Sequence, residues 1–111
     1  LYMKLTVSQL KYMLVLGSVS GDRGIRTVDI AKKLSIQRSS AFNMLNKLSD
    51  EGLVVKNDDK MVALTEQGKQ KADCLCKKVK DTVKKLEENF DLPREYAEDC
   101  ALMIISCSED I

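Results

Sequence analysis

The 111-residue sequence has no histidine, no tryptophan and only one proline. Histidine is the side chain that most often acts as an acid or base near neutral pH, and it is the commonest metal ligand in proteins. The sequence also lacks a glycine-rich phosphate-binding loop and a pair of carboxylates placed in an evident cleft. Together these absences argue against an enzyme.

Long apolar runs are missing as well. No run approaches the roughly 20 residues that a membrane-spanning helix needs, and there is no signal-peptide pattern. We therefore expect a cytoplasmic protein with no membrane partner. Its length fits one compact domain, or one domain with an appended dimerisation element.

Four cysteines are present: Cys74, Cys76, Cys100 and Cys107. In the cytoplasm they are expected to stay reduced. The spacing in "CLC" is not that of a zinc knuckle, and without histidine a zinc site would need all four thiolates. We therefore interpret them as small apolar helix residues and expect no cofactor. The alternative is a thiol-based or soft-metal sensor, because the lysines of "CLCKKVK" would favour a reactive thiolate.

The net charge is only +1, but its distribution is uneven. Residues 1–65 hold ten Lys and Arg against six Asp and Glu, whereas residues 66–111 hold eight against eleven. An anionic partner is therefore expected to meet the first half of the chain.

Apolar spacing and capping signals predict a mainly α protein with three helices in its first half. The first is "TVSQLKYMLVLGS", which opens with a capping box of Thr6 and Gln9. The second is the short "TVDIAKKLS", capped by Thr27, with Val28, Ala31 and Leu34 facing inward. After the turn "SIQRSS", the third runs from about Arg38 to Asp50, and Gly52 closes it.

The second half begins with a hairpin signal, two β-branched-rich runs in "LVVKNDDKMVALT". Thr65 then caps a long helix over residues 66–90. "DLP" ends that helix, and Pro93 marks the start of the last one, "REYAEDCALMIISCS". This order of elements is that of a winged helix-turn-helix followed by a long helix and a further apolar helix.

The third helix has two very different faces. Ala41, Leu45 and Leu48 form a small apolar face, and no acidic residue lies between Asp29 and Asp50. In a helix-turn-helix this helix enters the DNA major groove, where a carboxylate would be repelled by the phosphates. We predict that DNA is bound by Thr27, Gln37, Arg38, Ser39, Ser40, Phe42, Asn43, Asn46 and Lys47, with Lys56 and Lys60 in the wing.

The long helix and the apolar run Cys100–Ile105 carry more apolar surface than one copy of so short a chain can cover. We therefore expect a homodimer that presents two recognition helices to a palindromic operator in double-stranded DNA. Residues 1–65 would bind DNA and residues 66–111 would dimerise. The predicted interface residues are Leu75, Val79, Val83, Leu86, Phe90, Leu102, Ile104 and Ile105.

Three segments resemble the iron- and manganese-dependent repressors of the diphtheria toxin repressor type. They are "RTVDIAKKLSIQRSSAFNMLNKLSDEGLV", "VALTEQGKQKA" and the placement of "AEDC" on the last helix. Within the first two segments, "DEGLV" together with "LTEQG" also resembles other winged-helix regulators, such as the MarR type. The long helix, the "DLP" break and the apolar helix with "EDC" favour the metal-repressor type.

The resemblance implies a site for Fe²⁺ or Mn²⁺ that joins the DNA-binding and dimerisation units. The corresponding positions here are Ser8, Lys11, Val79, Val83, Tyr96, Cys100, Met103 and Ile104. Only Cys100 keeps a ligand type of that family, with Met103 a soft donor, whereas a first-row divalent ion needs several carboxylate or imidazole ligands. The metal site is thus expected to be lost. The wing also departs from the pattern, because Asp58 and Asp59 stand at its tip.

The sequence therefore predicts a dimeric DNA-binding transcriptional regulator, a repressor by its resemblance, that a divalent metal does not control. Two other hypotheses remain at this stage. One is the thiol-based or soft-metal sensor that uses the four cysteines, and the other is a winged-helix module that binds only protein.

Overall fold

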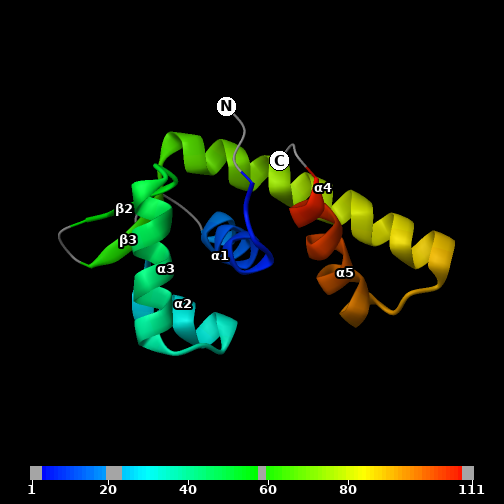
Figure 1. Ribbon diagram of the computed structural model, residues 1–111, viewed down its shortest axis with the longest axis horizontal. Coiled ribbons are helices and arrows are strands. Elements are labelled where there is room, and N and C mark those ends of the chain that lie inside the picture. The colour runs from blue at the N-terminus through cyan, green and yellow to red at the C-terminus, as the bar shows by residue number, and fades with distance from the viewer. Residues whose placement is uncertain (1–3, 20–23, 58–59, 109–111) are drawn as a thin grey trace.

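The structure is a computed structural model that describes residues 4–19, 24–57 and 60–108. Its elements form a winged helix-turn-helix followed by two further helices (Figure 1). In chain order they are α1 (Val7–Ser18), β1 (Ile25–Arg26), α2 (Thr27–Leu34), α3 (Arg38–Asp50), β2 (Val54–Lys56), β3 (Met61–Leu64), α4 (Glu66–Phe90) and α5 (Arg94–Cys107). The fold class expected from the sequence is confirmed.

Helix α1 begins with the predicted capping box. The Thr6 amide donates to Gln9 Oε1 at 2.9 Å, and the Gln9 amide donates to Thr6 Oγ1 at 3.2 Å. These two bonds satisfy amides that have no partner within the helix. Leu10, Met13 and Leu16 then turn one face of α1 into the core.

The predicted start of α2 was wrong. Thr27 is the first helical residue and not its cap; Arg26 is the N-cap, and its side chain makes no capping hydrogen bond. The reason is the strand β1, in which Ile25 and Arg26 pair with Val62 and Met61 of β3. A two-residue strand is too short to show a periodicity in the sequence, so it was not predicted.

Helix α3 has the predicted bounds and the predicted buried face. Ala41, Leu45 and Leu48 are fully buried. At its end the Gly52 amide donates to the Ser49 carbonyl and the Leu53 amide to the Leu48 carbonyl, each at 3.0 Å. With Gly52 at φ +79°, this is the left-handed turn that commonly closes a helix.

The wing is the antiparallel hairpin of β2 and β3, in a sheet of order β1-β3-β2. In its register Val54 stands opposite Leu64, and Lys56 stands opposite Val62. Asp58 and Asp59, expected at the wing tip, lie outside the described residues.

Helix α4 is the longest element and sets the shape of the molecule. Its 25 residues span about 37 Å, and the longest dimension of the chain is 47 Å. The predicted cap is present: Thr65 Oγ1 accepts from the Gly68 amide at 3.0 Å. The wing and α3 lie near the beginning of α4, and α5 packs along its later turns (Figure 1).

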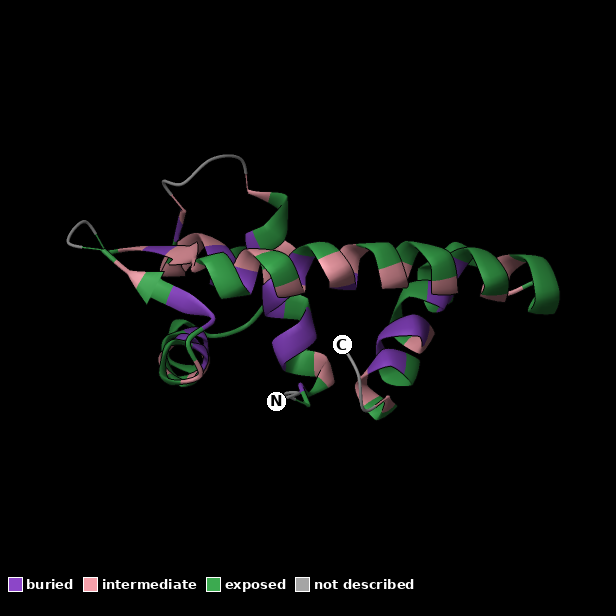
Figure 2. Cartoon of the chain, turned by 90° about the horizontal axis from the view of Figure 1, so that it is seen from above, coloured by how far each residue is buried: buried purple, intermediate pink, exposed green. Residues whose placement is uncertain are grey.

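The core continues across residue 65, where the sequence suggested a boundary. Ala72 and Leu75 of α4 and Leu102 and Ile105 of α5 belong to the same cluster as the buried face of α1. A smaller cluster joins α4 and α5 farther along. Figure 2 shows the outer side of α4 largely exposed, with buried residues toward α1 and α5. No helix in the described part of the chain is long and apolar enough to cross a membrane.

Candidate nucleic-acid interface

The polar face of α3 is open to solvent. Of the predicted DNA-binding residues on or beside it, the exposed ones are Gln37, Arg38, Ser39, Ser40, Phe42, Asn43 and Lys47, and Asn46 is half-buried. Between Arg38 and Ser49 the helix carries no acidic residue. Its side chains can therefore donate hydrogen bonds to phosphates or base edges without a carboxylate from this stretch of the helix opposing the approach.

The beginning of α3 is also electrostatically suited to an anion. Its first turn has no acidic residue, and the N-cap Gln37 makes no side-chain capping bond. A helix N-terminus carries a partial positive charge that favours phosphate. Arg38 adds a full charge at the same end, so this end of α3 is the part best suited to meet the DNA backbone.

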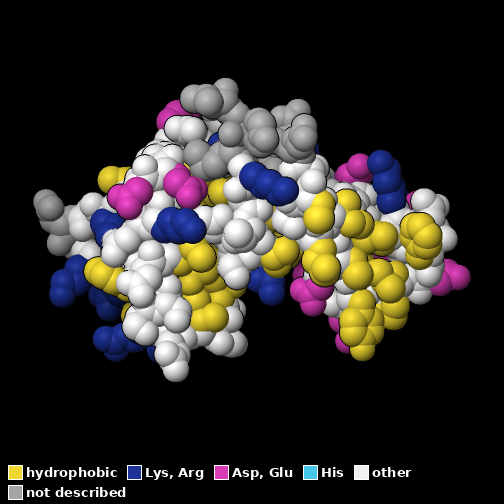
Figure 3. Space-filling view, in the orientation of Figure 1, with side chains coloured by type: hydrophobic (Ala, Val, Ile, Leu, Met, Phe, Trp, Pro, Cys, Tyr) yellow, Lys and Arg dark blue, Asp and Glu magenta, His cyan; other side chains and the backbone are white. Residues whose placement is uncertain are grey.

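A groove separates the wing from the first turns of α2 and α3. Its volume is about 810 Å³, and among the described residues its lining contains four cationic side chains and no carboxylate. The lining residues are Arg26, Thr27, Val28, Arg38, Phe42, Lys56, Asn57 and Lys60. Figure 3 shows Lys and Arg side chains gathered at this end of the molecule. A groove of this charge is suited to a phosphodiester strand.

The groove joins residues that the sequence analysis had singled out separately. Thr27, Arg38, Phe42, Lys56 and Lys60, from α2, α3 and the wing, all line it. Its fourth cation was missed. Arg26 was not among the predicted residues, because only the pairing of β1 with β3 brings it beside the wing.

One wing lysine is engaged with α3. Lys56 Nζ lies 4.0 Å from the centroid of the Phe42 ring, and it donates a hydrogen bond to Asn46 Oδ1. Phe42 and Asn46 are four residues apart, so they lie on the same side of the helix. Lys56 therefore differs from Lys60, for which the sequence suggested the same role.

The predicted dimerisation residues fall into two groups. Leu75, Val83, Leu102 and Ile105 are buried within the chain, so they contribute to its own core. Phe90 and Ile104 are 73% and 51% exposed, and Val79 and Leu86 are half-buried. The sequence showed that all eight positions are apolar, but it did not show which ones the chain covers by itself.

Two further apolar side chains, which were not among the predicted dimerisation residues, are also exposed. Tyr96 and Met103 of α5 are 58% and 61% exposed. We call Phe90, Tyr96, Met103 and Ile104 the apolar end surface. Figure 3 shows hydrophobic side chains gathered over α4 and α5, at the end of the molecule away from the wing.

The positions corresponding to metal ligands in the resembling family do not fit a divalent ion. Val83 packs with Ala97 and Ala101, and Val79, Leu86 and Leu92 pack around them. Ser8 and Lys11 of α1 are exposed. In the described ranges, no three His, Cys, Asp or Glu side chains come together as a metal site. At Val79 and Val83, hydrocarbon thus stands where the resemblance implies carboxylate or imidazole ligands.

The cysteines are free thiols. Cys74, Cys76 and Cys100 are half-buried, and Cys107 is exposed.

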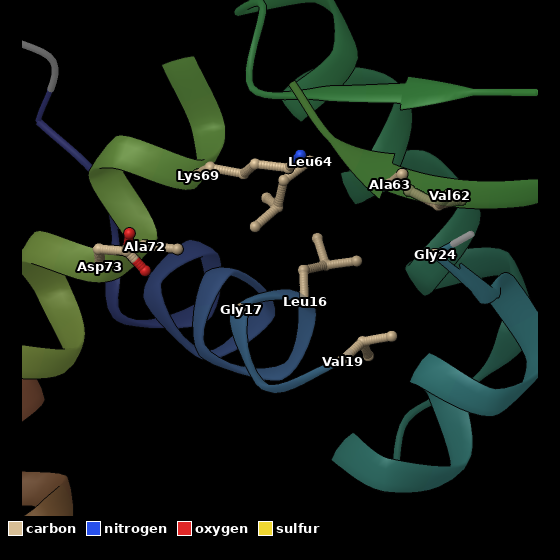
Figure 4. A pocket seen from close by; sticks show the side chains of 10 residues that line it. All are labelled: Leu16, Gly17, Val19, Gly24, Val62, Ala63, Leu64, Lys69, Ala72 and Asp73. Carbon is tan, nitrogen blue, oxygen red and sulfur yellow. The ribbon is translucent and has the colours of Figure 1, made fainter. Parts of the chain in front are cut away.

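A second cavity of about 280 Å³ lies between the end of α1, strand β3 and the start of α4. Figure 4 shows Leu16, Val19 and Leu64 on its apolar side, with Lys69 and Asp73 on α4. It contains none of the predicted site residues.

Comparison with known proteins agrees with the architecture. Residues 10–62 match the family described as iron dependent repressor, N-terminal DNA binding domain. This range runs from α1 into β3 and holds the complete helix-turn-helix. It confirms the resemblance to the iron-dependent repressors and supports a DNA-binding role for this part of the chain. Among curated proteins, none matches the chain.

Two solved structures resemble the chain over most of its length. The hypothetical protein SSo2273 from Sulfolobus solfataricus has 25% sequence identity and a TM-score of 0.70, over 94% of this chain and 80% of that one. A mutant of ZitR from Lactococcus lactis has 20% identity and a TM-score of 0.65, over 92% and 72%. The likeness to ZitR shows a shared fold.

Proposed function

We propose that this chain, whose residues 10–62 match the iron-dependent repressor family of DNA-binding domains, is a homodimeric repressor of transcription. The observation that carries the proposal is the acid-free, exposed face of α3 beside a groove lined by four cations. In this proposal residues 1–65 bind a palindromic operator and residues 66–111 form the dimer. Because its partner is DNA, we place the protein in the cytoplasm.

The apolar end surface supports the dimer. Its four large side chains, on α4 and α5, are each more than half exposed, and hydrophobic side chains gather over these helices at the end of the molecule away from the wing (Figure 3). A two-fold axis at this surface would cover it with its own copy and leave both α3 helices free. Two such helices about 34 Å apart would reach successive major grooves on one side of the DNA.

Asn43 supplies the sharpest test of base recognition. It is exposed on α3, and an asparagine amide can pair with an adenine edge. In titrations against a duplex that the unmodified chain selects from random sequence, Asn43→Ala should weaken binding by about 1 to 3 kcal/mol. Binding to unselected DNA should hardly change. Gln70→Ala, which removes an exposed amide from α4, is the matched control and should bind like the unmodified chain.

If Asn43→Ala binds every duplex as the unmodified chain does, and selection enriches no palindrome, α3 does not read bases. A protein-interaction module would then be the better account.

We further propose that no divalent metal regulates the protein, because the corresponding positions of α4 and α5 form an apolar cluster. Adding Mn²⁺ or Co²⁺ should therefore change the melting temperature by no more than about 1 °C. A ligand at 100 times its Kd would add about 2.7 kcal/mol to the stability. A rise of several degrees that a chelator reverses, and that Cys100→Ala abolishes, would contradict this part of the proposal.

A further inference from the structure

Lys56 is held by two side chains of the recognition helix. Its ammonium group lies over the ring of Phe42, 4.0 Å from the centroid, and hydrogen-bonds Asn46 Oδ1. A lysine ammonium has three hydrogens to donate and accepts nothing. The Asn46 amide must therefore turn its oxygen toward Lys56 and its NH₂ group away from it.

This orientation changes what Asn46 can recognise. A free asparagine offers one acceptor and one donor side by side, which matches the N6 and N7 atoms of adenine. Here the acceptor faces an ammonium group. The oxygen keeps a second lone pair, but a base amino group that used it would bring its partly positive N–H hydrogens close to the Lys56 ammonium group, which repels them. Because the amide oxygen is engaged by a cation, the pair presents chiefly donors: the Asn46 NH₂ and the remaining ammonium hydrogens.

Burial and the aromatic ring keep the pair in this arrangement. Asn46 and Lys56 are both half-buried, which shields their hydrogen bond from water and salt more than at an open surface site. Phe42 covers one side of the ammonium group, and such a contact favours the cation there. Lys56 ends strand β2, so the contact also ties the wing to α3.

We propose that Lys56 is a positioning residue that fixes Asn46 as a donor, so that the two side chains together bind a pair of acceptor atoms on the DNA. This inference rests on the proposed DNA-binding function. Two groups of DNA have the required chemistry: the N7 and O6 atoms of a guanine edge, and the oxygens of a phosphodiester. Adenine, whose edge combines an acceptor with a donor, is disfavoured at this position.

The test uses a duplex that the unmodified chain selects from random sequence. A series of duplexes replaces one guanine at a time with 7-deazaguanine, which lacks N7, and a second series replaces one phosphate at a time with a methylphosphonate, which lacks the charge. At one position in one series, the unmodified chain should lose about five- to 150-fold in affinity. The series in which the loss occurs identifies the acceptor.

Variants of the protein then show whether Asn46 and Lys56 contact the modified position. For Asn46→Ala and Lys56→Ala, the same modification should cost almost nothing, because each variant lacks half of the donor pair. Lys56→Arg should restore the sensitivity, since arginine also offers a cation to Phe42 and donors to Asn46. Lys60→Ala removes an exposed wing charge; it should weaken binding to all duplexes alike and keep the sensitivity of the unmodified chain.

Two failures are distinguishable. If no duplex is selected at all, the proposed DNA-binding function is wrong. If a duplex is selected and Lys56→Ala keeps the full sensitivity of the unmodified chain at every position, the positioning role of Lys56 is wrong and DNA binding stands.

Discussion

Replacing Ile104 with aspartate is expected to convert the dimer into folded monomers. Ile104 is 51% exposed in the single chain, so an aspartate there meets water and leaves the protomer intact. In the proposed dimer the same carboxylate would be buried without a partner, and two-fold symmetry introduces it twice. An unpaired buried charge of this kind costs about 3 to 5 kcal/mol. Sedimentation velocity at micromolar concentration, with circular dichroism to follow the fold, measures both effects.

Two controls separate assembly from folding. Ile105→Asp alters the neighbouring residue, which is only 4% exposed and belongs to the core; it should unfold the protomer. Val55→Asp alters a wing residue that is 50% exposed, and the protein should remain a dimer. The dimer is refuted if the unmodified chain sediments as a stable monomer, and the location of its interface is refuted if Ile104→Asp remains dimeric.

The second large effect is on stability. At Gly68, in the first turn of α4, an added Cβ would lie 2.0 Å from the Leu53 carbonyl oxygen and 3.0 Å from its carbon. These are backbone atoms, and the same oxygen accepts a hydrogen bond from the Thr65 amide at 3.0 Å, so it cannot move freely. Gly68→Ala should therefore force α4 away from the end of α3. We expect a loss of about 3 kcal/mol and a Tm lower by about 10 °C in calorimetry.

Gly17→Ala is the matched control, because it places the same methyl group in another helix. The nearest atom there is the Ala72 Cβ at 3.1 Å, a side-chain contact. Its effect should be within about 1 kcal/mol, since the gain in helix propensity offsets a small repacking. Equal melting temperatures for the two variants would show that the approach of α4 to Leu53 does not constrain the fold.

The sequence predicted the parts of the fold that depend on near neighbours. The caps at Thr6 and Thr65 and the closing glycine Gly52 involve residues within a few positions of each other. The acid-free face of α3 is likewise a local pattern. The cap of α2 was misplaced at Thr27 because β1, which ends at Arg26, exists only through its pairing with β3, more than thirty residues away.

Features that join distant segments could not be read from periodicity. The contact of Lys56 with Phe42 and Asn46 requires the wing to fold back on α3. The same limit applies to the dimer. An apolar stripe on a helix predicts that its residues are buried, but it does not show which surface buries them. The packing of α5 on α4 covers Leu102 within the chain and leaves Ile104 exposed.

The central claim is that a two-fold dimer presents α3 to successive major grooves. The most direct measurement is selection of the duplexes that the purified chain retains from a random-sequence library at physiological salt, followed by sequencing. The account predicts an enriched inverted repeat whose half-sites are centred about one helical turn, roughly 34 Å, apart or a multiple of that distance. No enrichment, or enrichment of a single unrepeated half-site, would contradict it.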